Sequence, residues 1–246
     1  MNDFLLYFSM KYCGDWDSIY KAIKSYEKID EDKIVEYINL DNIKDREYIS
    51  ILDEQYPDHF SYLRKPPFII YYYGNIDILY NSKKICLTGN YETESANKIL
   101  NNLDFENKEF VYVSEYWSGF DSKIVEKILE NNQKLIIVLN CGIEYFKATN
   151  NSKIFENPNV LLITEYPNDY HPTKKSLFAR NRILGAIAKN LVLISSTNHK
   201  MMPIVDNFIE YGKDVFCFVL EDDEKNDNIE LVNCGAKLIT NLNQVP

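Results

Sequence analysis

Residues 84–102 read KICLTGNYETESANKILNN, an apolar run followed by a glycine turn and then by a segment with helical periodicity. The same order continues along the chain, because the apolar run Phe110–Val113 precedes the helical stretch Asp121–Asn131, and a third run follows at Leu135–Leu139. Short, nearly continuous apolar strands that alternate with helices are typical of a parallel sheet with both faces covered. We therefore predict an α/β fold with a doubly wound, mostly parallel sheet.

Other apolar runs extend this alternation on both sides. They are Phe68–Tyr73, Val160–Thr164, Leu191–Ser195 and Val215–Leu220. Helices are expected at Glu92–Asn102, Lys175–Lys189 and Pro203–Tyr211. In such a sheet, ligands bind outside the carboxyl ends of the parallel strands, so the loops that follow the strands are the candidate site segments.

The first 60 residues have a different pattern. Apolar side chains lie at helical spacing in two groups, Trp16, Ile19, Ile23 and Tyr26, and then Ile34, Tyr37 and Ile38. No strand-like run interrupts them. Three prolines, Pro57, Pro66 and Pro67, lie between this region and the first predicted strand and indicate a boundary. We expect a small helical domain at residues 1–60 and a Rossmann-like domain at residues 61–246, with no third domain.

Composition restricts the possible functions. The 246 residues are 46% hydrophobic, which is enough for a large buried core. The formal net charge of -10 argues against indiscriminate binding to nucleic acid, because neutralising phosphates requires clustered lysine and arginine. Any site for a polyanion must therefore be local, and two of the four arginines, Arg180 and Arg182, lie within three residues.

The five cysteines are widely spaced and lie mostly within or beside apolar runs, so we interpret them as small core residues. Without a Cys-x-x-Cys pair and with only three histidines, the chain is not expected to bind a metal. No apolar run approaches the length of a membrane span, and the N-terminus lacks a basic signal segment. We expect a cytoplasmic protein that does not bind membranes.

Two loops after strands are candidate phosphate sites. The loop that contains Gly89 lacks a G-x-G-x-x-G pattern and places Glu92 and Glu94 at a helix start, where they would repel a pyrophosphate. We therefore predict no dinucleotide and no other cofactor. In the second loop, Ser114 and the amides near Gly119 could hold a phosphate or ribose. The alternative is that Asp121 caps the following helix and Trp117 packs against the core.

The segment Thr173–Arg182 places four cations and Phe178 at the start of an apolar helix. Cations are disfavoured at a helix N-terminus, so this placement indicates a function. Positive charge with an interleaved aromatic suits single-stranded nucleic acid, whose phosphates need cations and whose bases stack on rings. The alternative is that an arginine, Arg182 foremost, pairs with a buried acid such as Glu165 or Asp121.

Catalytic interpretations have little support. Glu165 could act as a general base, and Ser195–Thr197 with His199 could form a hydroxyl nucleophile and its base. No nucleophile-elbow pattern surrounds these serines and nothing in the sequence orients the histidine. We predict no catalytic residue and expect these side chains to shape the edge of the sheet.

Taken in order, these segments resemble the DprA/Smf family of DNA-processing proteins. The family motif S-G-x-A-x-G-I-D corresponds to Ser114–Asp121, and C-G-[LI]-[DE] corresponds to Cys141–Glu144. S-E-Y-P corresponds to Thr164–Pro167, and F-P-x-R-N-R-I-I, the most specific match, corresponds to Leu177–Leu184. The resemblance runs from about Tyr56 to Ala236 and implies an extended Rossmann-like domain preceded by a small helical domain.

The resemblance also implies a function. It implies single-stranded DNA binding, self-association as a homodimer, and handover of DNA to a RecA-type recombinase during transformation or recombination. The DNA-binding residues that it and the charge pattern indicate are Gly89, Ser114, Gly119, Lys174, Lys175, Phe178, Arg180, Asn181 and Arg182.

Three positions depart from the family pattern. Tyr91 replaces the arginine of V-G-x-R, Glu115 replaces the first glycine of the second motif, and His199–Met202 replaces a serine-glycine-serine loop. Each change removes a cation or a backbone that suits a phosphate. The leading hypothesis is a non-enzymatic, DprA-like single-stranded DNA-binding protein. The alternatives are a Rossmann-like protein that binds or processes a nucleotide-derived small molecule, and a degenerate member that serves as a partner-binding module.

Overall fold

The fold is described from a computed structural model. It describes residues 3–30, 32–34, 37, 47–105, 109–150, 152–220 and 225–246. The chain divides into two compact units, the first made of residues 1–76 and 139–180 and the second of residues 77–138 and 181–246. The expected domains at residues 1–60 and 61–246 stay a prediction.

Nine strands form one mixed sheet in the order β1-β2-β6-β5-β4-β3-β7-β8-β9. The strands are β1 (Glu47–Ser50), β2 (Ile69–Gly74), β3 (Lys84–Thr88), β4 (Val111–Ser114), β5 (Lys134–Val138), β6 (Val160–Thr164), β7 (Asn190–Leu193), β8 (Val215–Phe218) and β9 (Lys237–Ile239). In the second unit, β3 pairs in parallel with β4 and β7, β4 with β5, and β8 with β7 and β9. In the first unit, β1 and β6 both pair antiparallel with β2. The predicted Rossmann-like α/β fold with a mostly parallel sheet is confirmed.

Helices connect most of the strands. They are α1 (Asp3–Lys11), α2 (Trp16–Lys24), α4 (Asp58–Ser61), α5 (Glu94–Asn101), α6 (Phe120–Glu130), α7 (Ile143–Thr149), α8 (Lys174–Ile187), α9 (Met202–Glu210) and α10 (Asn228–Asn233). Short 3₁₀ turns lie at Ile76–Tyr80, Ser152–Ile154 and Leu242–Gln244. Every strand and helix named from its apolar run is present within about two residues of its expected bounds. The expectation that no strand precedes residue 60 is wrong, because β1 lies there.

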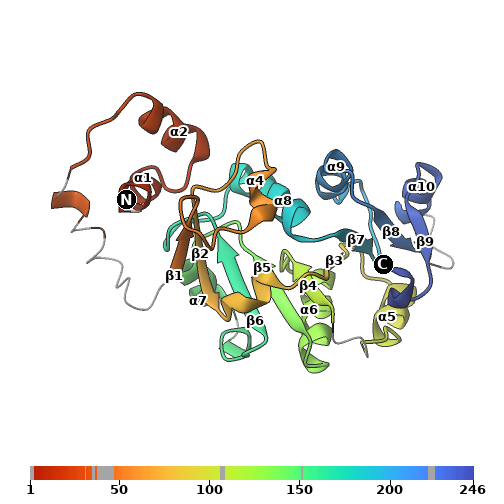
Figure 1. Cartoon of the computed structure of the whole chain (residues 1–246). Coiled ribbons are helices and arrows are strands. Elements are labelled where there is room, and N and C mark those ends of the chain that lie inside the picture. The colour runs from red at the N-terminus through yellow and green to blue at the C-terminus, as the bar shows by residue number, and fades with distance from the viewer. Residues whose placement is uncertain are drawn as a thin grey trace. The chain divides into compact units, whose positions relative to one another are not determined.

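The core of the second unit follows from its strand sequences. β3, β4, β7 and β8 are buried along their whole lengths, which explains why they consist almost entirely of apolar residues. Figure 1 shows β7, β8 and β9 side by side, with α9 and α10 beside them. Thr88, Ser114 and Asn190 are buried polar residues of these strands, and Lys84 is their one charged residue. Its Nζ donates hydrogen bonds to the backbone carbonyls of Leu79 and Asn81.

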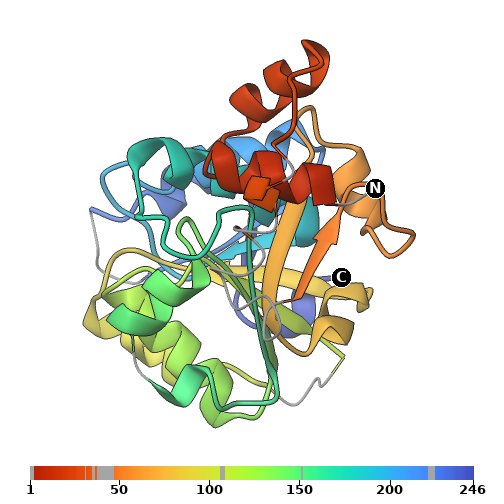
Figure 2. The same ribbon diagram turned by 90° about the vertical axis from the view of Figure 1, so that its left-hand side faces the viewer.

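In the first unit, a helical hairpin packs beside the antiparallel strands. Tyr7 and Phe8 of α1 pack against Ile19 and Ala22 of α2. Ile19 and Ile23 belong to the predicted apolar spacing and lie in this cluster, but the placement of Tyr26 on the same face is wrong, because Tyr26 follows the end of α2 and is 92% exposed. The hydroxyl of Tyr71 in β2 donates a 2.9 Å hydrogen bond to Ser9 Oγ of α1. Figure 2 shows the hairpin in red near the orange strands β1 and β2. Ile38, which was expected on the same helical face, lies outside the described residues.

The carboxyl edge of the second unit is held together by a buried carboxylate. Asp121, in the first turn of α6, accepts hydrogen bonds from Thr88 Oγ1 at 2.7 Å, from the backbone N of Trp117 at 2.8 Å and from Ser114 Oγ at 3.1 Å. It therefore joins the ends of β3 and β4 to the loop before α6. Burial, and secondly the charge of Glu115, raise the pKa of Asp121 to about 7, although its three hydrogen bonds act in the opposite direction.

This arrangement predicts a pH-dependent contribution to stability. The pKa of Asp121 in the folded protein lies above its ordinary value, so the contribution is present at low pH and is lost as the pH rises through about 7. We expect the free energy of unfolding of the wild type, relative to Asp121→Asn, to fall between about pH 4 and 7 with a slope of up to about 1.4 kcal/mol per pH unit. Urea unfolding at several pH values measures it.

Asp206→Asn, at an exposed position on α9, is the matched control for the loss of one carboxylate from this unit. A difference between wild type and Asp121→Asn that does not change with pH, or that grows as the pH rises, would contradict the assigned pKa of Asp121.

Candidate nucleic-acid interface

Helix α8 begins with a reciprocal cap that fixes its first turn. The backbone N of Ser176 donates to Thr173 Oγ1 at 3.0 Å, and the backbone N of Thr173 donates to Ser176 Oγ at 2.9 Å. Leu177 N donates to Thr173 O, which starts the helical hydrogen-bond pattern. Two hydroxyl residues three positions apart thus satisfy backbone groups that a helix start leaves without partners.

The first turn of α8 carries two lysines and no acidic residue. Lys174 and Lys175 are exposed, and Phe178, four residues after Lys174, is 56% exposed. Residues three and four apart lie on the same side of a helix, so these three side chains form one surface, which we call the lysine-phenylalanine face. The expected conflict between cations and the helix dipole is present in the structure.

The opposite side of α8 is buried. Ser176 and Arg180 continue into the apolar positions Ile183, Leu184 and Ile187, all of which are buried. Arg180 is only 1% exposed and is the largest fully buried side chain among the described residues. Residues that are neighbours in the sequence of α8 therefore lie on two different faces of the helix, and only the lysine-phenylalanine face is open to solvent.

The charge of Arg180 acts on the thiol of Cys141. Burial raises the pKa of Cys141 to about 11, and the positive charge of Arg180 partly opposes this rise. The sequence favours Arg182 as the arginine that pairs with a buried acid. In the structure Arg180 is the buried arginine, whereas Arg182 is half-buried and its charge acts on Tyr211. Asn181 is also buried. Contacts of these three residues with DNA stay a prediction, and the free chain offers the side chains of Arg180 and Asn181 no access to a ligand.

The two lysines of the face differ in their partners. Lys175 Nζ donates to Asp15 Oδ2, yet the lysine side chain remains 68% exposed. Lys174 makes no ion pair within the described part of the chain, so its charge is available to an external anion.

Gly89, Ser114 and Gly119, the other predicted site residues, lie in the second unit. Ser114 is fully buried, and its Oγ donates to Asp121 and accepts from the backbone N of Tyr116. Gly89 is buried, and an added Cβ would lie 3.1 Å from the backbone O of Ser195. Gly119 is exposed with φ of 101°, and an added Cβ would have no other atom within 4 Å. Of the three, only Gly119 presents its backbone to a ligand.

The alternative interpretation of this loop makes Asp121 the cap of the following helix. Gly119 is the N-cap residue of α6 and makes no side-chain cap, whereas Asp121 braces two strands and the loop. Trp117 is half exposed, so only part of its side chain packs against the protein.

Sequence reasoning missed a set of asparagines that join the neighbouring loops. Asn90 and Thr197 exchange two hydrogen bonds, with Asn90 Nδ2 donating to Thr197 O and Thr197 N donating to Asn90 Oδ1. Asn228 Nδ2 donates to carbonyls at the ends of β7 and β8. The only sequence signal for these contacts is that an asparagine or a hydroxyl residue lies at or just after the ends of β3, β4 and β7.

The serines after β7 join the same loops through hydrogen bonds. Ser195 Oγ donates a 2.5 Å hydrogen bond to the carbonyl of Tyr91, and Ser196 Oγ donates one of 2.5 Å to Asn228 Oδ1. The backbone N of His199 donates to Asp227 Oδ2. These contacts agree with the expectation that the residues shape the edge of the sheet.

Three of the five cysteines are buried and two are exposed. Cys86, Cys141 and Cys217 are buried, as expected, but Cys13 and Cys234 are exposed, so their interpretation as core residues is wrong. Among the described residues, no group of three or more His, Cys, Asp or Glu side chains could hold a metal ion. Within the same residues, no helix has the length and apolar character needed to cross a membrane.

Comparison with known proteins gives consistent matches. Residues 47–246 match the family model of DNA recombination-mediator protein A. The chain is 28% identical over 201 residues to DNA processing protein DprA of Streptococcus pneumoniae, covering 78% of this chain and 70% of that protein. It is 24% identical over 213 residues to protein Smf of Synechocystis, covering 82% of this chain and 54% of that protein.

Solved structures have the same fold. The X-ray structure of DprA from Streptococcus pneumoniae superposes with a TM-score of 0.76 at 23% identity, covering 98% of this chain and 90% of that one. A structure of DNA processing protein A from Helicobacter pylori, which describes its single-stranded DNA binding mode, gives a TM-score of 0.67 at 25% identity, covering 78% of this chain and 91% of that one. The resemblance inferred from the motifs is confirmed, and the chain belongs to the DNA recombination-mediator protein A family, which includes the DprA and Smf proteins.

Proposed function

We propose that this protein binds single-stranded DNA without catalysing a reaction on it, and that it protects the strand and delivers it to a RecA-type recombinase. The setting is DNA uptake by transformation and homologous recombination in the cytoplasm. The observation that carries this proposal is the lysine-phenylalanine face, an exposed group of two cations and one aromatic ring on a chain of net charge -10.

The chemistry of this face fits a single strand better than a duplex. Lys174 and Lys175 can each pair with a backbone phosphate, and the exposed ring of Phe178 can stack on a base, which a duplex would keep within its own stack. A phosphate at this position would also interact favourably with the N-terminus of α8. Membership of the recombination-mediator family supports the assignment, as does the single-stranded DNA binding of the Helicobacter pylori protein.

The loop contacts of the second unit weigh against the nucleotide alternative. Asn90, Tyr91 and Ser195 satisfy one another through backbone and side-chain hydrogen bonds, so the groups that would cradle a phosphate are already engaged. Glu92, paired with Lys123, adds negative charge at the same loop. Thermal shift against a panel of nucleotides would detect such a ligand by its stabilisation of the folded state.

Removing either lysine charge of the lysine-phenylalanine face should weaken DNA binding. Lys174→Gln and Lys175→Gln are each expected to weaken oligo-dT binding and to lower the dependence of log affinity on log salt by about 0.7 for each phosphate that is no longer neutralised. Fluorescence anisotropy over a salt series measures both quantities. Lys134→Gln, which removes an exposed charge at the amino end of β5, is the matched control.

A separate outcome is expected for the ring. Phe178→Ala should weaken binding by about 1–3 kcal/mol, the range for one stacked base, without changing the salt dependence. Tyr62→Ala removes an 86% exposed ring elsewhere and should bind like the wild type. If the wild type fails to bind oligo-dT at low salt, or if none of the lysine and phenylalanine variants weakens binding, the assigned site is wrong.

Arg180 makes a poor probe of DNA binding because it is buried. Truncating a buried charged side chain removes packing and leaves its partners unsatisfied, so loss of binding by Arg180→Ala would not separate contact from misfolding. The exposed lysines change charge at the surface alone, and their variants therefore test the DNA contact directly.

The proposed role in recombination predicts a gain in filament assembly. Adding the protein to RecA-type recombinase on single-stranded DNA coated with a single-strand-binding protein should raise the rate of DNA-dependent ATP hydrolysis. The Lys174→Gln, Lys175→Gln double variant should lose this effect, because it no longer holds the strand. Equal rates with and without the wild-type protein would contradict the recombinase step while leaving DNA binding intact.

We also propose that the protein acts as a homodimer. Light scattering after size-exclusion chromatography should then give twice the mass of one chain at micromolar concentration. A mass equal to one chain, under conditions in which oligo-dT binds, would show that binding does not require a second copy.

A further inference from the structure

The segment that joins α1 to α2 makes consecutive contacts within the first unit, and one of them reaches the lysine-phenylalanine face. Gly14 has φ of 71°, and an added Cβ would lie 2.5 Å from the carbonyl O of Glu165. Trp16 Nε1 donates a 2.7 Å hydrogen bond to Pro66 O, and its ring stacks on Phe68 at 5.3 Å. These contacts fix the start of α2 on either side of Asp15.

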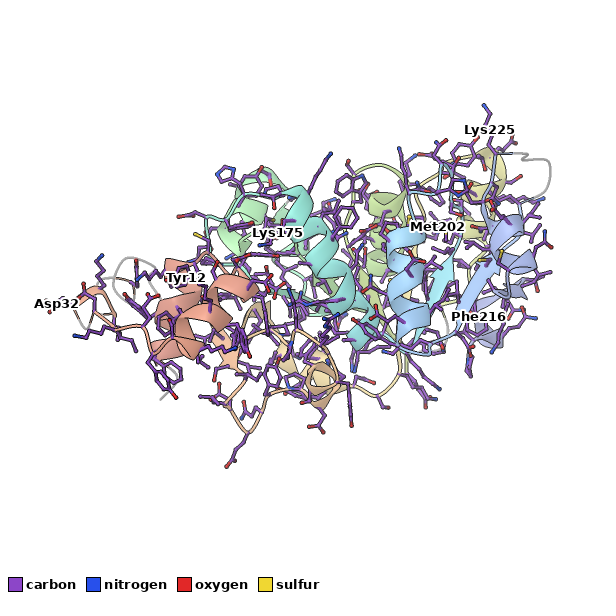
Figure 3. The ribbon with its side chains drawn as sticks, turned by 90° about the horizontal axis from the view of Figure 1, so that it is seen from above. Tyr12, Asp32, Lys175, Met202, Phe216 and Lys225 are labelled. Atoms are coloured by element: carbon purple, nitrogen blue, oxygen red, sulfur yellow. The ribbon has the colours of Figure 1, made fainter. Side chains whose placement is uncertain are left out.

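Asp15 uses its two carboxylate oxygens for different purposes. Oδ1 accepts hydrogen bonds from Ser18 N at 3.1 Å and Ser18 Oγ at 2.6 Å, which caps the N-terminus of α2. Oδ2 accepts from Lys175 Nζ. Figure 3 shows Lys175 at the start of α8, on the side toward the N-terminal hairpin that carries Tyr12.

The charge state of Asp15 keeps this contact ionic. Burial acts to raise the pKa of Asp15, but hydrogen bonds from Lys175 and Ser18 outweigh it and hold the pKa below its ordinary value. The same hydrogen bond raises the pKa of Lys175. Both groups are therefore charged at neutral pH, and one of the two cations of the face carries a carboxylate as its counter-ion in the free protein.

We propose that Asp15 is an internal competitor for nucleic-acid phosphate at Lys175. Asp15 occupies this lysine in the free chain, and a phosphate of the bound strand displaces it, so that the N-terminal hairpin lowers the affinity for DNA. This inference rests on the proposed single-stranded DNA binding and adds its regulation by the chain's own helical hairpin.

The exchange is physically reasonable because the lysine of the pair is open to solvent, although the Asp15 side chain is only 26% exposed. Ion pairs of this kind contribute little, since water and salt screen them, and the lysine side chain is 68% accessible. A DNA phosphate brings the same negative charge to Lys175 and, through the neighbouring nucleotides, can reach Lys174 and Phe178 as well. Asp15 keeps its bonds to Ser18 after displacement, so α2 retains its cap.

Asp15→Asn isolates the competing charge. Asparagine is as good an N-cap residue as aspartate and keeps the oxygen that Ser18 needs, but it carries no anion for Lys175. We expect this variant to bind oligo-dT about two- to five-fold more tightly than the wild type, as the loss of one exposed ion pair would allow. Asp15→Ser, which also caps helices well, is a second variant should asparagine disturb the turn.

Asp17→Asn is the matched control. Asp17 lies in the first turn of α2, two residues after Asp15, and its ion pair is with Lys65. It acts on Lys175 only through its charge, without a hydrogen bond, and its substitution gives the same change of net charge. Any gain that comes only from lowering the negative charge of the hairpin will appear equally in both variants. The competitor model requires the gain of Asp15→Asn to exceed that of Asp17→Asn.

A double-mutant cycle with Lys175→Gln decides the mechanism. In that background Asp15 has no lysine to occupy, so Asp15→Asn should give no more gain than Asp17→Asn. If the wild type binds and the two substitutions are additive, the inference is overturned while the proposed function stands. If only Asp15→Asn binds, competition is stronger than expected and the inference is supported. If neither binds oligo-dT, the proposed function and the inference both fail.

Discussion

The first turn of α8 is the electrostatic constraint on which the proposed DNA-binding face depends. Its peptide dipoles already give this end of the helix a partial positive charge, and Lys174 and Lys175 add two full charges to it. The other end has the opposite arrangement, because Lys213 Nζ donates to the carbonyls of Gly185, Ala186 and Ala188, where a cation is favoured. The helix therefore has one satisfied end and one end that gains stability from an anion. Asp15 supplies part of that anion from within the chain.

The sequence predicted the fold well where burial alone determines the structure. β3, β4, β7 and β8 are buried on both faces, so their residues had to be apolar without alternation, and this pattern is visible in one sequence. β1 was missed because its four residues, Glu47–Ser50, have no such run and form a strand only through antiparallel pairing with β2. β9 was missed for a related reason, since two of its three residues are exposed.

The sequence indicated the helix that carries the candidate site, but charge alone did not separate its exposed cations from its buried one. The conflict of cations with the helix N-terminus pointed to Lys174 and Lys175, both of which are exposed. Arg180 is a cation like these two lysines. It lies three residues before Ile183 and four before Leu184, so it belongs to the buried face of the helix. Helical periodicity could have shown this. The contact of Asp15 with Lys175 joins residues 160 positions apart, and only the folded chain reveals it.

Because the chain is acidic overall, any attraction for DNA depends on a few local cations. A protein of net charge -10 gains little long-range attraction for DNA, so binding must come from contacts formed at short range. At Tyr91, where family members carry an arginine, the backbone carbonyl accepts from Ser195 and holds the loop, but the position supplies no cation. At Glu115 the substitution adds an anion that raises the pKa of Asp121. Lys175 is one of only two cations on the lysine-phenylalanine face, so a change of its charge removes half of the positive charge of that face. An internal carboxylate that occupies this lysine can therefore control affinity in a way that it could not on a strongly basic surface.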